Sequence, residues 1–158
     1  MKIAIGCDHG GFRLKEEIVE HFESKKIEYF DFGAYNDESV DYADFALKVA
    51  EEVVAKKFDL GILICGTGIG IGIAANKVPG IRAALCSDTF SAHASRQHNN
   101  ANILTLGQRV VGTGLALDIV DVFLNAQFEG DRHLRRINKI SEIEKKYSND
   151  NEWGSKNE

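Results

Sequence analysis

The chain alternates short, almost wholly apolar segments with longer amphipathic ones, and this alternation is the feature that most restricts its fold. Five apolar segments have the length of β-strands: residues 2–6, 27–33, 60–65, 81–86 and 101–107. The segments that follow them repeat apolar residues every three or four positions, which predicts helices covered on one side: 12–26, 40–57, 73–77, 88–100, 113–127 and 131–147.

This order of elements predicts the fold class. Strands that are apolar along their whole length are buried on both faces, and strands joined through helices run parallel. With right-handed crossovers, the result is an α/β fold, a Rossmann-like three-layer αβα sandwich with a five-stranded parallel sheet. We expect one domain over residues 1–147 and a disordered tail at 148–158, where the sequence SNDNEWGSKNE is polar and aperiodic.

Composition excludes several classes of function. The net charge of −5 argues against a nucleic-acid-binding surface, which is basic. The apolar runs are far shorter than the roughly 20 residues that span a membrane, and the N-terminal run is too short for a signal peptide. The three cysteines include no C-x-x-C pair, so neither a disulfide framework nor a zinc site is expected. We expect a cytoplasmic protein with free thiols.

Polar and glycine-rich stretches follow the predicted strands, where ligands bind in parallel sheets. Asp8 and His9 follow the first strand, and Arg109 follows the fifth. The third strand ends at Cys65, and four glycines at alternate positions follow it. In the stretch LGILICGTGIGIG (60–72), the glycines have no side chains to cover the backbone N–H groups. These N–H groups can therefore converge on an anion. The spacing of the glycines matches neither the dinucleotide fingerprint G-x-G-x-x-G nor a P-loop.

The chemistry of this edge centres on Cys65. Amides at a helix N-terminus stabilise a thiolate, which can act as nucleophile or as base. Among the five histidines, His9 at a strand end and His98 at a helix end have the positions most typical of site residues. Arg132 and Arg136 share one helix face, and paired guanidinium groups suit phosphate oxygens. These residues predict a small phosphorylated ligand.

Six motifs together resemble the ribose-5-phosphate isomerase B family, which also contains the galactose-6-phosphate isomerase subunits. They cover residues 2 to about 147 and read GCDHGG, VDYADFA, ILICGTGIGI, AANKVPGIRAALC, SRQHNNANILTLGQRVVG and GDRHLRRI. The resemblance implies an aldose–ketose isomerase without metal or cofactor. Its substrate and product would be D-ribose 5-phosphate and D-ribulose 5-phosphate of the non-oxidative pentose phosphate pathway, with an enediolate between them.

The resemblance also implies roles for catalytic residues. Cys65 matches the base that moves a proton between C1 and C2, Thr67 the residue that hydrogen-bonds the thiol, and His98 the histidine that opens the furanose ring. Some family members carry serine at the position of Cys65 and a glutamate four residues later. Here that later position is Ile69, so this sequence falls in the cysteine subgroup.

The remaining matches concern substrate binding. The amides of Gly66, Gly68, Ile69 and Gly70 match the hole for the enediolate oxygens, a role that requires close backbone approach. Asp8, Asn99 and Tyr42 match residues that contact the sugar. The phosphate-binding set is matched by His9, Arg109, Arg132 and Arg136. Two departures, Gly72 where serine is usual and Ala43 where proline is usual, touch none of these roles.

In the family the site is completed across a dimer interface, so the resemblance implies a homodimer with shared active sites, or a tetramer. One alternative is an isomerase of a six-carbon sugar phosphate, such as allose 6-phosphate or galactose 6-phosphate, which needs a longer pocket. Another is a non-catalytic sugar-phosphate sensor, which would not need both a thiol base and a ring-opening histidine. A nucleotide-binding module of flavodoxin type rests on the fold alone.

Overall fold

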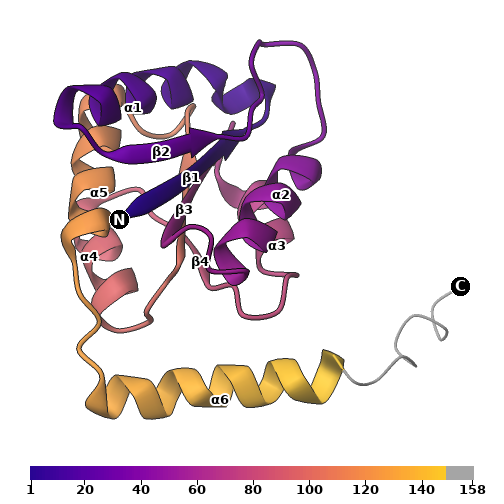
Figure 1. Ribbon diagram of the computed structural model, residues 1–158, viewed down its shortest axis with the longest axis vertical. Coiled ribbons are helices and arrows are strands. Elements are labelled where there is room, and N and C mark those ends of the chain that lie inside the picture. The colour runs from indigo at the N-terminus through magenta and orange to yellow at the C-terminus, as the bar shows by residue number, and fades with distance from the viewer. Residues whose placement is uncertain (149–158) are drawn as a thin grey trace, which may run out of the picture.

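The computed structural model describes residues 1–148, and the order of its elements follows the predicted alternation (Figure 1). The elements are β1 (Lys2–Cys7), the 3₁₀ turn η1 (His9–Gly11), α1 (Phe12–Lys25), β2 (Glu28–Asp31), α2 (Tyr42–Val54), β3 (Leu60–Cys65), α3 (Ile69–Ala75), β4 (Ala83–Leu85), α4 (Thr89–Gln97), β5 (Ile103–Gly107), α5 (Thr113–Asn125) and α6 (Asp131–Ser148). The predicted tail lies outside the described residues, except for Ser148, which ends α6.

The five strands form one parallel sheet in the order β2-β1-β3-β5-β4. Helices α1, α4 and α5 cover one face and α2 and α3 cover the other (Figure 1). The predicted αβα sandwich with five parallel strands is therefore confirmed. β2 lies on one side of β1 and β3 on the other, so the order of the strands reverses between β1 and β3. At this point a crevice opens at the carboxyl ends of the two strands.

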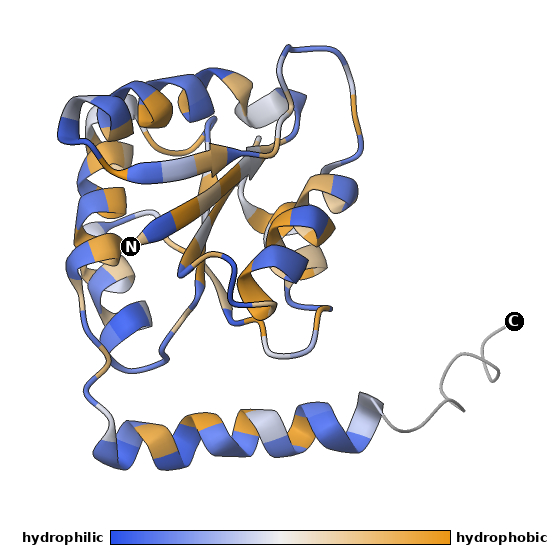
Figure 2. Cartoon of the chain, viewed as in Figure 1, coloured by the Kyte–Doolittle hydropathy of each residue, from blue (hydrophilic) through white to orange (hydrophobic). Residues whose placement is uncertain are grey.

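Alternate residues of the central strands face opposite helical layers, which divides the core in two. Ile3 and Ile5 pack with Phe22 and Phe123 in the larger cluster, under α1, α4 and α5. Their neighbour Ala4 packs in the second cluster, under α2 and α3. Figure 2 shows the apolar strands enclosed by helices whose outward faces are hydrophilic. This two-sided burial explains why β1, β3 and β5 are almost wholly apolar, whereas the edge strands β2 and β4 are only partly buried.

The helix after the glycine run begins earlier than predicted. The sequence predicted a glycine loop followed by a helix at 73–77, but α3 already starts at Ile69 and contains Gly70. A Cβ atom at Gly70 would lie 2.9 Å from the ring of Tyr42, closer than side chains pack. The glycine therefore allows α2 and α3 to approach each other, and it is not a loop residue.

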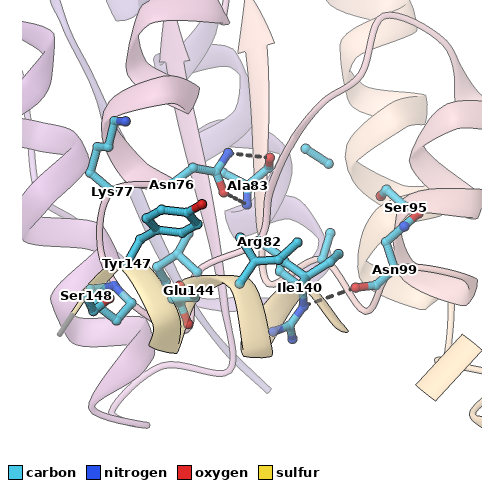
Figure 3. A pocket seen from close by; sticks show the side chains of 15 residues that line it. Asn76, Lys77, Arg82, Ala83, Ser95, Asn99, Ile140, Glu144, Tyr147 and Ser148 are labelled. Atoms are coloured by element: carbon cyan, nitrogen blue, oxygen red, sulfur yellow. Dashed lines mark hydrogen bonds between the residues drawn. The ribbon is translucent and has the colours of Figure 1, made fainter. Parts of the chain in front are cut away.

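Helix α6 lies below the sandwich and is joined to it by residues 126–130 (Figure 1). Ile137 is buried, whereas Leu134 and Ile140 on the same helix are nearly half exposed. The Glu144 carboxylate accepts a hydrogen bond from the Gly80 N–H, which ties α6 to the turn before β4. A groove of about 720 Å³ lies between α6 and the β4 side of the sandwich (Figure 3).

Within residues 1–148, no helix has the length and apolar character needed to cross a membrane.

Substitutions at two glycines test how closely the backbone is packed at the crevice and at the start of α5. A Cβ atom at Gly11 would lie 2.5 Å from the carbonyl oxygen of Ile64 in β3, so Gly11→Ala forces the backbone to move. We expect this substitution to lower the free energy of unfolding by about 1–3 kcal/mol. At Gly114, in the first turn of α5, a Cβ atom meets nothing within 4 Å. Gly114→Ala should therefore raise stability by about 0.4–1 kcal/mol. Urea unfolding measures both, and equal stabilities would contradict this packing.

Candidate active site

A cavity of about 230 Å³ lies at the carboxyl ends of β1, β3 and β5. Eight of the residues predicted for the site line it: Asp8, His9, Tyr42, Cys65, Gly66, Thr67, Gly70 and Arg109. The parallel register explains their convergence, because Cys65 pairs with Gly107 and Cys7 with Ile64, so the loops that follow these strands begin side by side.

The Cys65 sulfur is held by the backbone of the turn that follows it. The Gly68 N–H donates a hydrogen bond to Cys65 Sγ, with an N···S distance of 3.1 Å. Gly68 adopts a left-handed φ of 77°, and a Cβ atom there would lie 2.8 Å from the carbonyl carbon of Leu106. An N–H directed at the sulfur stabilises negative charge on it. The geometry therefore suits a thiolate, and only glycine fits the turn.

The other two cysteines lie in chemically different surroundings. Cys7 and Cys86 are buried, like Cys65, and all three are free thiols. Burial raises the pKa of Cys7 to about 12 and that of Cys86 to about 11. Neither lines the cavity. Of the three thiols, Cys65 alone is placed to meet a ligand at this edge of the sheet.

Arg109 and Thr67 shape the wall beside the thiol. The Arg109 N–H donates to the Gly66 carbonyl at 3.0 Å, and its guanidinium lies close over Gly66, where a Cβ atom would be 3.3 Å from Arg109 Cζ. The Ile69 N–H donates to Thr67 Oγ1 at 3.3 Å. The Thr67 hydroxyl therefore accepts from the start of α3, and its own proton remains available to a ligand or to the thiol.

His9 and Asp8 present polar groups to the same cavity. The Val40 N–H donates to His9 Nδ1 at 3.2 Å, so in the neutral ring Nε2 carries the proton and can donate it to an anion. Asp8 is 6% exposed, and its Oδ1 atom has no hydrogen-bond partner in the described residues. A buried carboxylate oxygen is costly to leave unpaired, and hydroxyl groups of a bound sugar would satisfy it.

The other predicted side chains form a second group, away from this cavity. His98 ends α4, and its ring stacks on that of His133 with centroids 4.4 Å apart and planes 9° apart. Arg132 Nε donates to His133 Nε2 at 3.2 Å. Because α4 returns from the end of β4 to the start of β5, its last turn lies at the amino edge of the sheet, opposite Cys65. Asn99 and Arg136 belong to the same two segments, so one chain carries two separate groups.

His98, His133 and Glu129 bring donor atoms within 4.8 Å of one another, which raises the question of a metal site. The arrangement is unfavourable for a cation. Stacked parallel rings direct their nitrogen lone pairs side by side, whereas a metal needs them to converge. The guanidinium groups of Arg132 and Arg136, which act on the His133 ring, would also repel a cation.

The sequence reasoning missed two residues. Gly10 lines the cavity, and a Cβ atom there would lie 3.1 Å from the Gly66 nitrogen, so it lets the β1 and β3 loops meet. The signal for it was the second glycine of GCDHGG. His133 was also missed, although it lies beside Arg132 in GDRHLRRI, because sequence does not show that its ring stacks on His98.

Comparison with known proteins identifies the family of this chain. A family model described as "Ribose/Galactose Isomerase" matches residues 3–140. The chain belongs to this family. The predicted family and the predicted class, an isomerase, are thereby confirmed.

Individual relatives match nearly the whole chain. The Escherichia coli (strain K12) protein named ribose-5-phosphate isomerase B is 53% identical over 92% of this chain and 97% of its own length. The Clostridium thermocellum ribose-5-phosphate isomerase B structure has a TM-score of 0.92 and 61% identity, covering 93% of this chain and 99% of that one. The Mycoplasma genitalium enzyme, solved with bound ribulose-5-phosphate, has a TM-score of 0.86 and 49% identity, covering 91% and 96%.

Thiol labelling tests the contrast among the cysteines. At pH 8 the Cys7 and Cys86 thiols stay protonated, because their pKa values lie near 12 and 11, and both are buried away from the cavity. We expect iodoacetamide to modify one thiol per folded chain rapidly, and peptide mass spectrometry to locate it at Cys65. Cys65→Ala should abolish the rapid phase. A rapid phase on Cys7 or Cys86 would refute this assignment.

Proposed function

We propose that this protein interconverts D-ribose 5-phosphate and D-ribulose 5-phosphate through an enediolate, with Cys65 as the base. The observation that carries the proposal is the Cys65 sulfur, held by the Gly68 N–H in a polar cavity beside His9 and Arg109. The names of the relatives support the same substrate pair, since one solved relative binds ribulose-5-phosphate. The three free cysteines fit a reducing cytoplasm.

The chemistry requires a base and stabilisation of negative charge on oxygen. In the open-chain aldose, the Cys65 thiolate removes the proton from C2, and the C–H electron pair forms the double bond of the enediolate. The carbonyl π electrons move onto O1, and transfer of the O2 hydroxyl proton to O1 together with return of the proton from Cys65 to C1 gives the ketose. The negative oxygens would lie against the bare backbone of residues 66–70, where N–H groups at the start of α3 stabilise them. Thr67 lines the same cavity, and its hydroxyl group can donate to the thiol or to a substrate oxygen.

The phosphate and the sugar hydroxyls need separate partners. His9 Nε2–H and the Arg109 guanidinium line the cavity and can bind phosphate oxygens, while Asp8 Oδ1 can accept from a hydroxyl group. In our proposal Arg132 and Arg136 complete the phosphate site, Asn99 contacts the sugar, and His98 opens the ring. These four belong to the second group at the opposite edge of the sheet, and in our proposal a second chain supplies them.

Exposed apolar side chains support a homodimer that joins the two groups. Beside the cavity and along the β4 side, large apolar residues are between 45% and 78% exposed: Ile69, Ile73, Leu85, Phe90 and Val110. Helix α6 adds Leu134, Ile140 and Ile143, and Figure 2 shows apolar bands along it. Such exposure is typical of surfaces that pair with another subunit. A two-fold arrangement would give two equivalent sites, each built from both chains.

Replacing the base tests the proposed reaction. Without a thiolate near C2, Cys65→Ala should lower kcat for ribose 5-phosphate by about 10²–10⁴-fold, the usual contribution of a positioned base. Binding of the phosphate should change little, because the cavity's cationic groups remain. Cys86→Ala is the matched control, since this buried thiol lies outside the cavity. The assay compares ribose 5-phosphate with allose 6-phosphate and galactose 6-phosphate, and undiminished turnover by Cys65→Ala would exclude the assignment.

Hybrid dimers test the shared site. Cys65→Ala and His98→Asn chains are each nearly inactive on cyclic substrate, but a dimer containing one of each has one site with both native residues. If the chains mix at random, half of the dimers are hybrids with one of two sites intact, so about a quarter of wild-type activity should return. Coexpression of the two variants with distinct tags, followed by assay, measures this. Activity no greater than that of the separate variants would show that each chain builds its own site.

A further inference from the structure

Arg82 connects the sheet edge to the turn that carries His98. It directly precedes β4, and its side chain crosses to the segment after α4, on the wall of the groove below the sheet (Figure 3). Arg82 Nε donates to the carbonyl oxygens of Asn99 and Asn100 at 3.1 and 3.0 Å, and Nη2 donates to that of Asn100 at 2.9 Å. Three N–H···O contacts therefore hold two consecutive peptide groups.

These two carbonyl groups need an external partner. They lie just beyond the last turn of α4, where the helix dipole favours a cation. Asn100 also adopts a left-handed φ of 45°, which is uncommon for a residue with a side chain. Backbone hydrogen bonds from the Asn100 N–H to the Arg96 carbonyl oxygen (3.1 Å) and from the Ala101 N–H to that of Ser95 (2.9 Å) close this turn, and Arg82 binds the two carbonyl groups that these bonds do not use.

The backbone of Arg82 is itself fixed. Its N–H donates to Asn102 Oδ1 at 2.7 Å, and its carbonyl oxygen accepts from the Asn102 N–H at 3.1 Å. Arg96 holds the other side of the turn through Asn100 Oδ1 and the Ala101 carbonyl oxygen. Among residues 1–148, Arg82 alone donates a hydrogen bond to the carbonyl group of Asn99, next to His98.

We propose that Arg82 is a positioning residue for ring opening, which fixes the turn His98–Asn99 so that the His98 side chain meets the bound sugar. This inference rests on the proposed function. A lysine would not replace it, because one ammonium group cannot reproduce the fixed fork formed by Nε and Nη2. Burial lowers the pKa of Arg82, and the nearby Glu144 carboxylate acts in the opposite direction.

The test separates ring opening from isomerisation. 4-Deoxyribose 5-phosphate lacks the O4 atom that closes the furanose ring, so it bypasses His98. The readout is the ratio of kcat/KM for ribose 5-phosphate to kcat/KM for this analogue. In Arg82→Met we expect the ratio to fall about 100-fold, the loss that a displacement of about 1 Å produces.

Lys77→Met is the control, because it removes a positive charge from the same groove and should leave the ratio unchanged. A general loss of stability lowers both values equally, and an unchanged ratio in Arg82→Met would overturn the inference.

A double-mutant cycle distinguishes this inference from the proposed function. His98→Asn should lower the ratio by itself, and Arg82→Met should lower it no further in that background, because both act through one side chain. Additive losses would show that Arg82 acts independently of His98 and would overturn the positioning role. An unchanged ratio in His98→Asn would instead refute the ring-opening role in the proposed function.

If Arg82→Met does not fold, Arg82→Lys replaces it. This variant keeps the charge but not the paired donors, so the ratio should still fall about 10-fold. A ratio equal to that of the wild type would overturn the inference.

Discussion

The hydrogen bond from the Gly68 N–H to the Cys65 sulfur is the contact on which the candidate site depends. It exists because β3 ends in a turn that only glycine can form, with φ of 77° and no room for a Cβ atom against Leu106. The same turn starts α3 and places its N–H groups beside the thiol. One tight backbone turn therefore fixes the sulfur, exposes the amides and brings the helix terminus to the cavity.

The arrangement of the elements divides the chemistry between two edges of the sheet. The loops after β1, β3 and β5 carry the thiol, the carboxylate and the first cationic groups, whereas the end of α4 and the start of α6 carry His98 and the arginines. In our proposal a second chain joins the two groups. This would make activity depend on assembly, and it accounts for an α6 that lies apart from its own sandwich and leaves apolar residues exposed.

The sequence predicted the sheet and its helices because buried parallel strands and amphipathic helices have distinct periodicities. It also predicted the residues that line the cavity, since parallel strands bring their carboxyl ends to one edge. It placed the start of α3 wrongly, because glycine at Gly70 serves close packing against Tyr42 rather than a loop. The edge strand at 81–86 is reduced to β4 (Ala83–Leu85), since it pairs on one side only. The stacking of His98 on His133 depends on how α6 lies, which periodicity does not determine.

The most direct test of the proposed mechanism is a crystal structure of the protein with 4-phosphoerythronohydroxamate, whose hydroxamate imitates the enediolate. We predict that Cys65 Sγ contacts the atom that stands for the reacting carbon. The hydroxamate oxygens should face the backbone N–H groups of residues 66–70, and His98 from a second chain should close the cavity. A hydroxamate bound in the groove between α6 and the sandwich, or a Cys65 sulfur turned away from the hydroxamate, would contradict the account.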